Sequence, residues 1–206
     1  MERIQPAADV PAPEPAANAW PSLALYRSLR EQMAADPYWT DQILWQESAR
    51  RPSDAGDMAR EIAFVIVNSG MNHRVARPIY ERVALELAAG RPIFPGAFRH
   101  VGKCTAIESI WARRDDLFGQ LAGLSDAEML EWCGRLPWVG PITKYHLAKN
   151  WGADVVKPDR WLDRIATKAG GTPLEVCQRL AEATGDRVAT VDLVLWWSCA
   201  NGHLRP

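Results

Sequence analysis

Asp159 is the side chain in this 206-residue sequence that is best placed to do chemistry. It follows Pro158 and stands at the start of a segment with helical periodicity, so its carboxylate is expected at a helix N-terminus. The helix dipole keeps a carboxylate ionised there, and an ionised carboxylate can stabilise a positive charge that develops during bond cleavage. The simpler interpretation is a helix cap, because aspartate is a preferred N-cap residue. One residue can serve both roles.

Residues 136–151 have the pattern of two helices joined by a tight turn, a hairpin. Residues 138–140, Trp-Val-Gly, form the turn, and Pro141 takes the first position of the second helix, where proline is tolerated. Gly152 is expected to end that helix as a left-handed cap. A hairpin of this kind directs backbone N–H groups and a helix N-terminus outward, so it can hold an anionic phosphate without recognising a base.

The second helix of the hairpin has two kinds of positions. Thr143, Leu147 and Trp151 are spaced by four residues and share one face. Lys144 and Lys149 fall off this face, and we expect them to face solvent or a phosphate. The expected nucleic-acid contacts of the hairpin come from Val139, Gly140, Thr143 and Lys144.

The hairpin and the aspartate together resemble the helix-hairpin-helix DNA glycosylases, the superfamily of endonuclease III, the adenine glycosylases and the alkylbase glycosylases. The matching residues are Leu136-Pro137, Val139-Gly140, Thr143, Val155-Val156, Pro158-Asp159 and Arg164-Ile165, with Asp159 standing 19 residues after Gly140. Residues 61–80 are similar to the early buried helix and turn of the family, and residues 191–196 to its closing core helix. The resemblance covers most of residues 23–204.

The resemblance implies a reaction and a role for Asp159. These enzymes flip a base out of duplex DNA and hydrolyse its N-glycosidic bond. The carboxylate of Asp159 would stabilise the oxocarbenium-like sugar or position the attacking water. Ile142 stands where members with lyase activity carry a lysine, and an alkyl side chain cannot form a Schiff base. Lys144 and Lys157 fit the lysine position poorly and are more simply backbone contacts. The resemblance therefore implies a monofunctional enzyme that leaves an abasic site.

Trp138 departs from the family pattern, because the first glycine of the hairpin usually stands there. Glycine permits a positive φ that an indole-bearing residue resists. Either the backbone avoids positive φ at this position or Trp138 packs against the nucleic acid, and both alternatives stay open.

Two further sets of residues are candidates for contact with DNA. By resemblance, Asn68 and Ser69 lie in the turn that inserts a wedge where the nucleotide leaves, although the same turn could merely cap two helices. Ten tryptophans are unusual in one chain, and an extruded base needs aromatic surfaces to stack on. The expected base pocket contains Trp161, two residues after Asp159, with Trp45 and Trp111, while tryptophans such as Trp196 and Trp197 are more typical of a core.

The sequence predicts an all-α, two-lobed fold of the helix-hairpin-helix glycosylase type, with the active-site cleft between the lobes. Residues 1–19 are rich in proline and alanine and are expected to form a disordered tail, and residues 20–206 are expected to form one domain. Helices are predicted at residues 22–35, 39–49, 56–68, 73–89, 103–112, 115–122, 126–134, 142–151, 159–169, 173–184 and 187–200. Ser125 with Glu128 and Thr172 with Glu175 have the spacing of capping boxes.

Composition indicates an ordinary globular protein, with 48% hydrophobic residues and a formal net charge of −1. Basic residues nevertheless exceed acidic ones by four over residues 135–168, on the expected DNA side. No signal peptide or membrane span is indicated, so a cytoplasmic, nucleoid-associated monomer that binds double-stranded DNA is expected. The four cysteines are widely spaced, which favours buried thiols over an iron–sulfur cluster, a zinc site or disulfides. No cofactor is expected, although the hairpin leaves room for a structural monovalent or divalent cation.

Several functions remain open at this point. The excised base could be alkylated or oxidised, as in base excision repair, or a hypermodified phage base, which would make the protein an antiphage defence enzyme. A second hypothesis is a DNA-binding module that keeps the hairpin and has lost catalysis. A third is a helical scaffold that binds protein, for which affinity for duplex DNA would be negligible even at low salt.

Overall fold

The computed structural model describes residues 20–206, and over these residues the chain forms α-helices joined by turns, without β-strands. The predicted all-α class is confirmed, while the predicted tail at residues 1–19 lies outside the described residues. The helices are α1 (Leu23–Ala34), α2 (Pro37–Ser48), α3 (Ala55–Asn68), α4 (His73–Ala88), α5 (Val101–Ala112), α6 (Arg114–Leu121), α7 (Asp126–Gly134), α8 (Thr143–Asn150), α9 (Arg160–Ala169), α10 (Pro173–Thr184) and α11 (Val188–Ala200).

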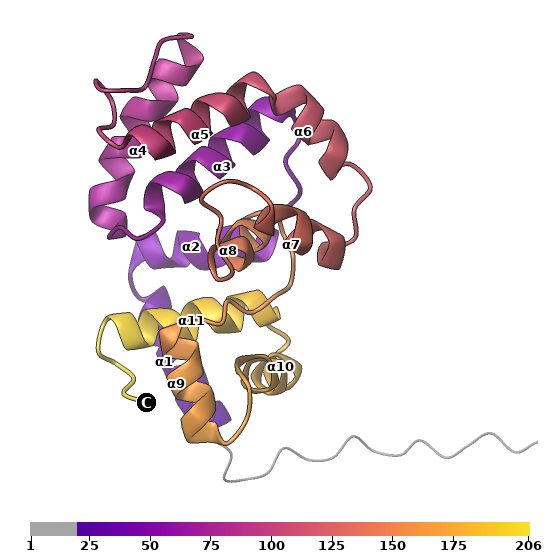
Figure 1. Ribbon diagram of the computed structural model, residues 1–206. Helices are drawn as coiled ribbons and strands as arrows, with labels where there is room; N and C mark the ends of the chain where they lie inside the picture. Colours follow the sequence, from indigo (N-terminus) through magenta and orange to yellow (C-terminus); the bar gives the residue numbers. More distant parts are fainter. Residues whose placement is uncertain (1–19) are drawn as a thin grey trace, which may run out of the picture.

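The helices form two groups that are discontinuous in sequence. Figure 1 shows α3 to α8 in the upper part of the molecule and α1, α9, α10 and α11 in the lower part, with α2 between them. Helix α3 is central to the upper group, where it packs against α4, α5, α6 and α8. In the lower group, α11 packs against α1, α2, α9 and α10. The start and the end of the described chain therefore lie together.

Side-chain caps explain where most helices begin. A side-chain oxygen accepts a hydrogen bond from a backbone N–H of the first turn at Ser22, Asp36, Asp54, Asn72, Ser125, Asp159 and Thr172. Both predicted capping boxes are present. Helices α2 and α5 start two residues earlier than predicted, because Asp36 caps α2 at Pro37 and the imidazole of His100 accepts a hydrogen bond from the backbone N–H of Lys103 in α5.

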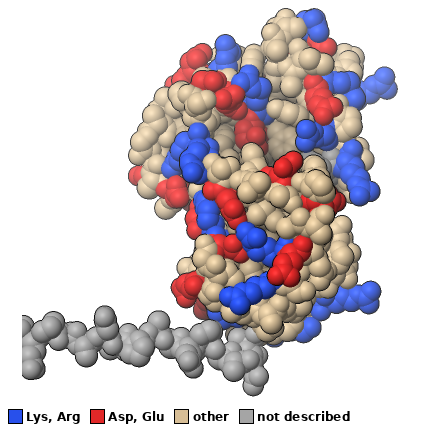
Figure 2. Space-filling model, turned by 180° about the vertical axis from the view of Figure 1, so that it is seen from behind, with Lys and Arg blue, Asp and Glu red and all other residues tan. Residues whose placement is uncertain are grey.

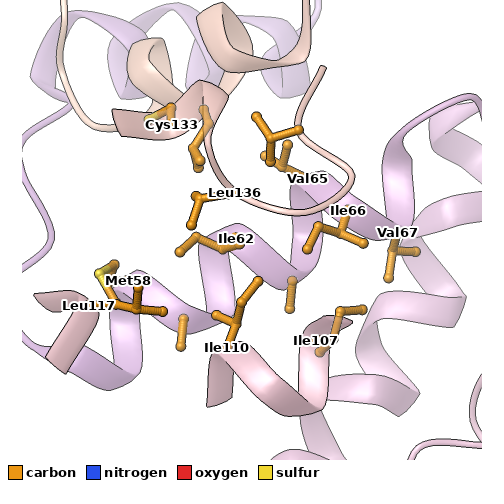
Figure 3. Close-up of a cluster of buried hydrophobic side chains, with 14 of the residues drawn as sticks. Met58, Ile62, Val65, Ile66, Val67, Ile107, Ile110, Leu117, Cys133 and Leu136 are labelled. Carbon is orange, nitrogen blue, oxygen red and sulfur yellow. The ribbon is translucent and has the colours of Figure 1, made fainter. Parts of the chain in front are cut away.

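The upper group surrounds its own hydrophobic core. Figure 3 shows side chains of α3, among them Ile62, Ile66 and Val67, packed between α5 and the segment that leads into the hairpin. Leu136 and Val139 belong to this core. The hairpin is thus attached to the upper group by apolar contacts.

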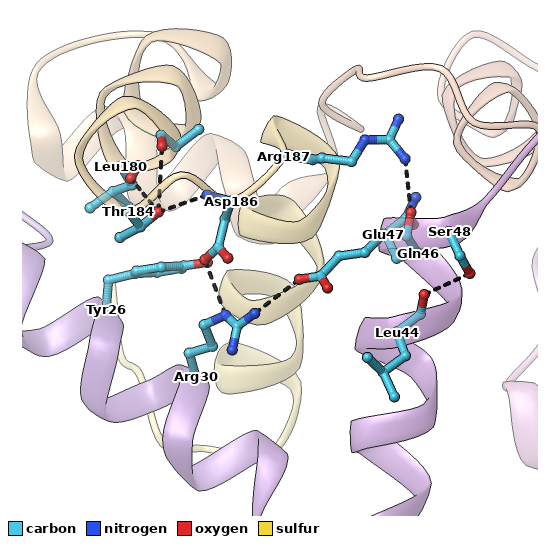
Figure 4. A network of polar contacts seen from close by, with 11 residues as sticks. Tyr26, Arg30, Leu44, Gln46, Glu47, Ser48, Leu180, Thr184, Asp186 and Arg187 are labelled. Carbon is cyan, nitrogen blue, oxygen red and sulfur yellow. Dashed lines mark hydrogen bonds and ion pairs between the residues drawn. The ribbon is translucent and has the colours of Figure 1, made fainter.

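The lower group surrounds a second hydrophobic core, formed by α1, α2 and α9 to α11. A polar network at its edge joins these helices (Figure 4). Asp186, just before α11, accepts hydrogen bonds from the Tyr26 hydroxyl at 2.6 Å and from Nε of Arg30 at 3.1 Å. Arg30 also pairs with Glu47 of α2 at 2.9 Å. These bonds fix α1 and α2 against the start of α11.

The link between the two groups carries Asp159. Residues 151–159 run from the end of α8 to the start of α9, with Ala153 packed in the upper core and Val156 in the lower one. Gly152 has φ of +84° and ends the hairpin helix in the left-handed conformation that the sequence predicts. Among helices of residues 20–206, none combines the length and apolar character needed to cross a membrane.

Candidate active site

An open pocket of about 440 Å³ surrounds Asp159. Its lining residues come from the hairpin, from the start of α9 and from α11: Ile142, Pro158, Asp159, Arg160, Trp161, Asp163 and Trp196. Asp159 and Ile142 are 17 residues apart in sequence, and the fold brings them to one cavity. The acid and the alkyl side chain that the sequence analysis singles out thus line the same pocket.

The carboxylate of Asp159 is held in place by the start of α9. One oxygen, Oδ1, accepts hydrogen bonds from the backbone N–H groups of Trp161 at 2.9 Å and Leu162 at 3.3 Å. The other oxygen, Oδ2, lies 3.8 Å from Nζ of Lys157. The side chain keeps 13% of its surface exposed. Asp159 therefore caps α9 through Oδ1, and the backbone hydrogen bonds of this helix start do not involve Oδ2.

The pocket is aromatic on the side of the lower group. Trp161 makes cation–π contacts with Arg160 and Arg164, whose guanidinium groups lie 5.0 Å and 5.2 Å from its ring centroid. Trp196, half-buried in α11, lines the same pocket and contacts Trp39 with 6.4 Å between the ring centroids. Trp161 lies beside Asp159 as the sequence suggests, whereas the sequence offers Trp196 only as a core residue.

The hairpin turn keeps a glycine-like backbone at Trp138, where φ is +66°. The alternative in which the backbone avoids positive φ is therefore wrong. The indole N–H donates a hydrogen bond to the carbonyl oxygen of Gly102 at 3.1 Å, and the ring meets that of His100 edge to face. Val139, next in the turn, is buried in the upper core. The protein itself thus anchors the side chain of Trp138, which stays 44% exposed.

The start of α8 differs from the prediction. Lys144 N–H donates to the carbonyl oxygen of Gly140 at 3.0 Å, but α8 begins at Thr143, so Pro141 precedes the helix instead of taking its first position. Ile142 is the N-cap, and no side chain of the described residues caps this end. Thr143 is half-buried, and Lys144 forms an ion pair with Glu131 at 2.6 Å. An uncapped helix N-terminus can bind an anion.

The expectation that Lys149 faces solvent or a phosphate is wrong. Its side chain is only 9% exposed, and Nζ forms an ion pair with Asp192 of α11 at 2.5 Å. Asp192 also accepts a hydrogen bond from the backbone N–H of Lys157 at 2.9 Å. Helical periodicity shows which residues share a face but not where another helix packs, so the sequence alone hides this contact.

Asn68 and Ser69 lie at the end of α3, and their turn is tied to α5. The ammonium group of Lys103 donates to the carbonyl oxygens of Val67 at 3.2 Å and Ser69 at 2.6 Å. Burial lowers the pKa of Lys103. The same ammonium lies 5.8 Å from the ring centroid of Trp138. Lys103 therefore connects the predicted wedge turn to the hairpin turn.

Trp45 and Trp111 do not line the pocket of Asp159. Trp45 is 44% exposed on α2. Trp111, on α5, packs at the edge of the upper core with the guanidinium of Arg114 at 4.9 Å from its ring centroid. Their positions do not support the predicted grouping with Trp161, because periodicity cannot show which segments the fold brings together.

Only part of the positive charge of residues 135–168 is exposed at the surface. Of the basic residues of the 135–168 segment, Lys149 and Lys144 are neutralised by carboxylates, and those with exposed side chains are Arg135, Arg160, Arg164 and Lys168. On the face seen in Figure 2, basic and acidic side chains are interspersed without a large patch of one sign.

All four cysteines are buried and unpaired. Burial, with the charge of Asp159 adding to it, raises the pKa of Cys199 to about 11. The thiol nearest the site is thus protonated at neutral pH and is a poor nucleophile. Within residues 20–206, no group of three or more His, Cys, Asp or Glu side chains is arranged to hold a metal ion.

Comparisons with protein-family models, with curated proteins and with solved structures found no match for this chain. The function must therefore be inferred from the chemistry of the site.

Proposed function

We propose that this protein is a monofunctional DNA glycosylase of the helix-hairpin-helix type, which extrudes a damaged or modified base and hydrolyses its N-glycosidic bond. The observation that carries the proposal is the shared pocket of Asp159, Ile142, Trp161 and Trp196. It combines an oriented carboxylate, an aromatic surface and an open mouth. At about 440 Å³ the pocket falls in the usual size range of small-ligand sites.

The reaction breaks the bond between C1′ of the sugar and the base nitrogen, and the bonding electrons leave with the base. Positive charge develops on the sugar, and the carboxylate of Asp159 stabilises it from a position fixed by the N–H groups of Trp161 and Leu162. Water then adds to C1′ and loses a proton to Oδ2 of Asp159, while the departed base, which kept the bonding electrons, takes up one proton from solvent, to which Asp159 returns its own. The product is a free base and an abasic site.

The absence of an amine at Ile142 supports a hydrolytic rather than a lyase reaction. The side chain is 39% exposed and lines the pocket, but it has no nucleophilic atom. Lys157 lies close to Asp159, with its Nζ 3.8 Å from the carboxylate, but it is not among the residues that line the pocket.

DNA contact is assigned in this proposal to the side of the molecule that carries the hairpin. The uncapped N-terminus of α8 would hold a phosphate, and Arg160, Arg164 and Lys168 of α9 supply exposed positive charge. The two hydrophobic cores, joined by the link that carries Asp159, are consistent with a two-lobed glycosylase domain over residues 20–206.

A base-release screen tests the proposal. Duplex oligonucleotides that contain one alkylated base, one oxidised base or one hypermodified pyrimidine are incubated with the protein, beside unmodified DNA. We expect free base from one class, with strand cleavage only after alkali. Binding to abasic-site DNA without release from any substrate would instead identify an inactive hairpin module. Negligible affinity for duplex DNA at low salt would identify a helical scaffold.

A further inference from the structure

Asp192 is a buried acid that the proposed reaction does not use directly. Its side chain is 2% exposed and accepts two hydrogen bonds, from Nζ of Lys149 at 2.5 Å and from the backbone N–H of Lys157 at 2.9 Å. These donors belong to the hairpin helix α8 and to the link before Asp159. One carboxylate therefore ties together α8, α11 and the link.

The ion pair lies where the two hydrophobic cores meet. The neighbours of Lys149 in α8, Leu147 and Ala148, belong to the upper core, and Val191, beside Asp192, belongs to the lower core. Two charges at such a place lose their hydration, and an apolar pair of similar volume is often as stable or more so. Stability alone is therefore a poor explanation for this pair, whereas a fixed geometry between the two groups is a good one.

The position of Asp159 depends on the residue that Asp192 holds. The backbone N–H of Asp159 donates to the carbonyl oxygen of Lys157 at 2.7 Å, and Asp192 fixes the N–H of the same residue. On the other side, the carbonyl oxygen of Lys149 accepts a hydrogen bond from the Gln46 amide at 3.3 Å. The hairpin helix and the reactive aspartate are thus connected by short polar contacts through one side chain.

We infer that Asp192 is a positioning residue, which with Lys149 sets the place of the Asp159 carboxylate relative to the hairpin that holds the DNA. The inference rests on the proposed glycosylase function and deepens it. A displacement of about 1 Å in such an arrangement can slow a reaction on the order of 100-fold without a loss of binding.

The test compares two double variants that both remove the ion pair. Lys149→Met with Asp192→Leu also removes the acceptor of the Lys157 N–H, whereas Lys149→Met with Asp192→Asn keeps an oxygen acceptor. The single-turnover rate of base release is measured at saturating protein on the substrate found in the screen. Affinity is measured on a duplex with a tetrahydrofuran abasic analogue. Arg30→Met with Asp186→Asn is the matched control, because it removes an ion pair of the lower group whose side chains bond to neither the link nor α8.

We expect the leucine variant to lose roughly 100-fold in single-turnover rate with affinity for the abasic analogue within about threefold. The asparagine variant, which keeps an acceptor for the Lys157 N–H but lacks the ion pair, should have a rate between those of the leucine variant and the wild type, and the control should match the wild type. If the leucine variant does not fold, Asp192→Glu replaces it, because glutamate shifts the carboxylate by one methylene. The expected result is again a reduced single-turnover rate with nearly unchanged affinity for the abasic analogue.

A wild-type rate in the folded leucine or glutamate variant would overturn the positioning role. An equal loss of rate and affinity would overturn it as well, because it would indicate a purely structural effect. Failure of the proposed function itself is seen separately, as absence of base release by the wild-type protein.

Discussion

The indole of Trp138 and the backbone of Gly102 form one joint between the hairpin and α5. The indole N–H donates to the Gly102 carbonyl oxygen at 3.1 Å. A Cβ on Gly102 would stand 2.9 Å from Cζ2 of the indole, closer than van der Waals contact allows. Trp138 has a left-handed backbone, with φ of +66°. Its indole packs so closely on α5 that position 102 has room only for glycine.

This joint predicts a coupling between the two positions. Gly102→Ala should destabilise the wild-type protein by about 1 kcal/mol, because it displaces the indole and its hydrogen bond. In a Trp138→Gly background the same change should stabilise by roughly 0.5 kcal/mol, because alanine favours a helix over glycine. Urea denaturation of the four proteins measures the coupling. An equal effect of Gly102→Ala on the free energy of unfolding in both backgrounds would show that residues 102 and 138 are not coupled.

If the proposed function holds, Ile142→Lys should add lyase chemistry to base release. The side chain lines the pocket of Asp159 and is 39% exposed, so a lysine there can place its amine at the sugar and form a Schiff base. We expect a covalent protein–DNA adduct after borohydride reduction, and strand cleavage without alkali. Ile142→Arg adds charge without a nucleophilic amine and is the control. Intact base release with no trapped adduct in the lysine variant would place residue 142 out of reach of the sugar.

Trp196→Ala should weaken the reaction through loss of the aromatic surface. Stacking of a base on an aromatic side chain contributes roughly 1–3 kcal/mol, which corresponds to a loss of about 5-fold to 150-fold in kcat/KM. Trp45→Ala is the matched control, since Trp45 is exposed on α2 and outside the pocket. Equal kinetic losses in the two variants would remove Trp196 from the base pocket.

Glu61 predicts a pH dependence of stability. Burial raises the pKa of this α3 carboxyl above its ordinary value of 4.5, although the Asn150 amide donates to it and acts in the opposite direction. The folded state therefore binds the proton more tightly than the unfolded state. The stabilisation is complete at pH below about 4.5 and is lost as the pH rises through the raised value.

Glu61→Gln keeps an oxygen for the Asn150 amide and removes this titration. We expect the variant to be more stable than the wild type near neutral pH and to show no gain in acid, as measured by the free energy of unfolding across the pH range. A stability difference that does not change with pH would contradict the assigned burial effect.

Local chemistry explains why much of the fold could be predicted. The capping boxes at Ser125 and Thr172 and the left-handed cap at Gly152 depend on residues close in sequence, and all three are present. The placement of Asp159 at the start of α9 has the same origin.

The rest depends on contacts between distant segments. Lys149 lies off the apolar face of its helix but is buried by Asp192, 43 residues later. Trp196 resembles a core residue in sequence, and it becomes a pocket residue because α11 packs against α9. The spacing of residues within a segment predicts neither the burial of Lys149 nor the place of Trp196 in the pocket.

The most direct measurement is base release by Asp159→Asn. Asparagine is as good an N-cap as aspartate, so the variant should fold and should bind the abasic analogue as the wild type does. We expect its single-turnover rate to fall by at least about 100-fold, because the charge that stabilises the developing cation is gone. Base release at the wild-type rate by the folded variant would contradict the catalytic role of Asp159.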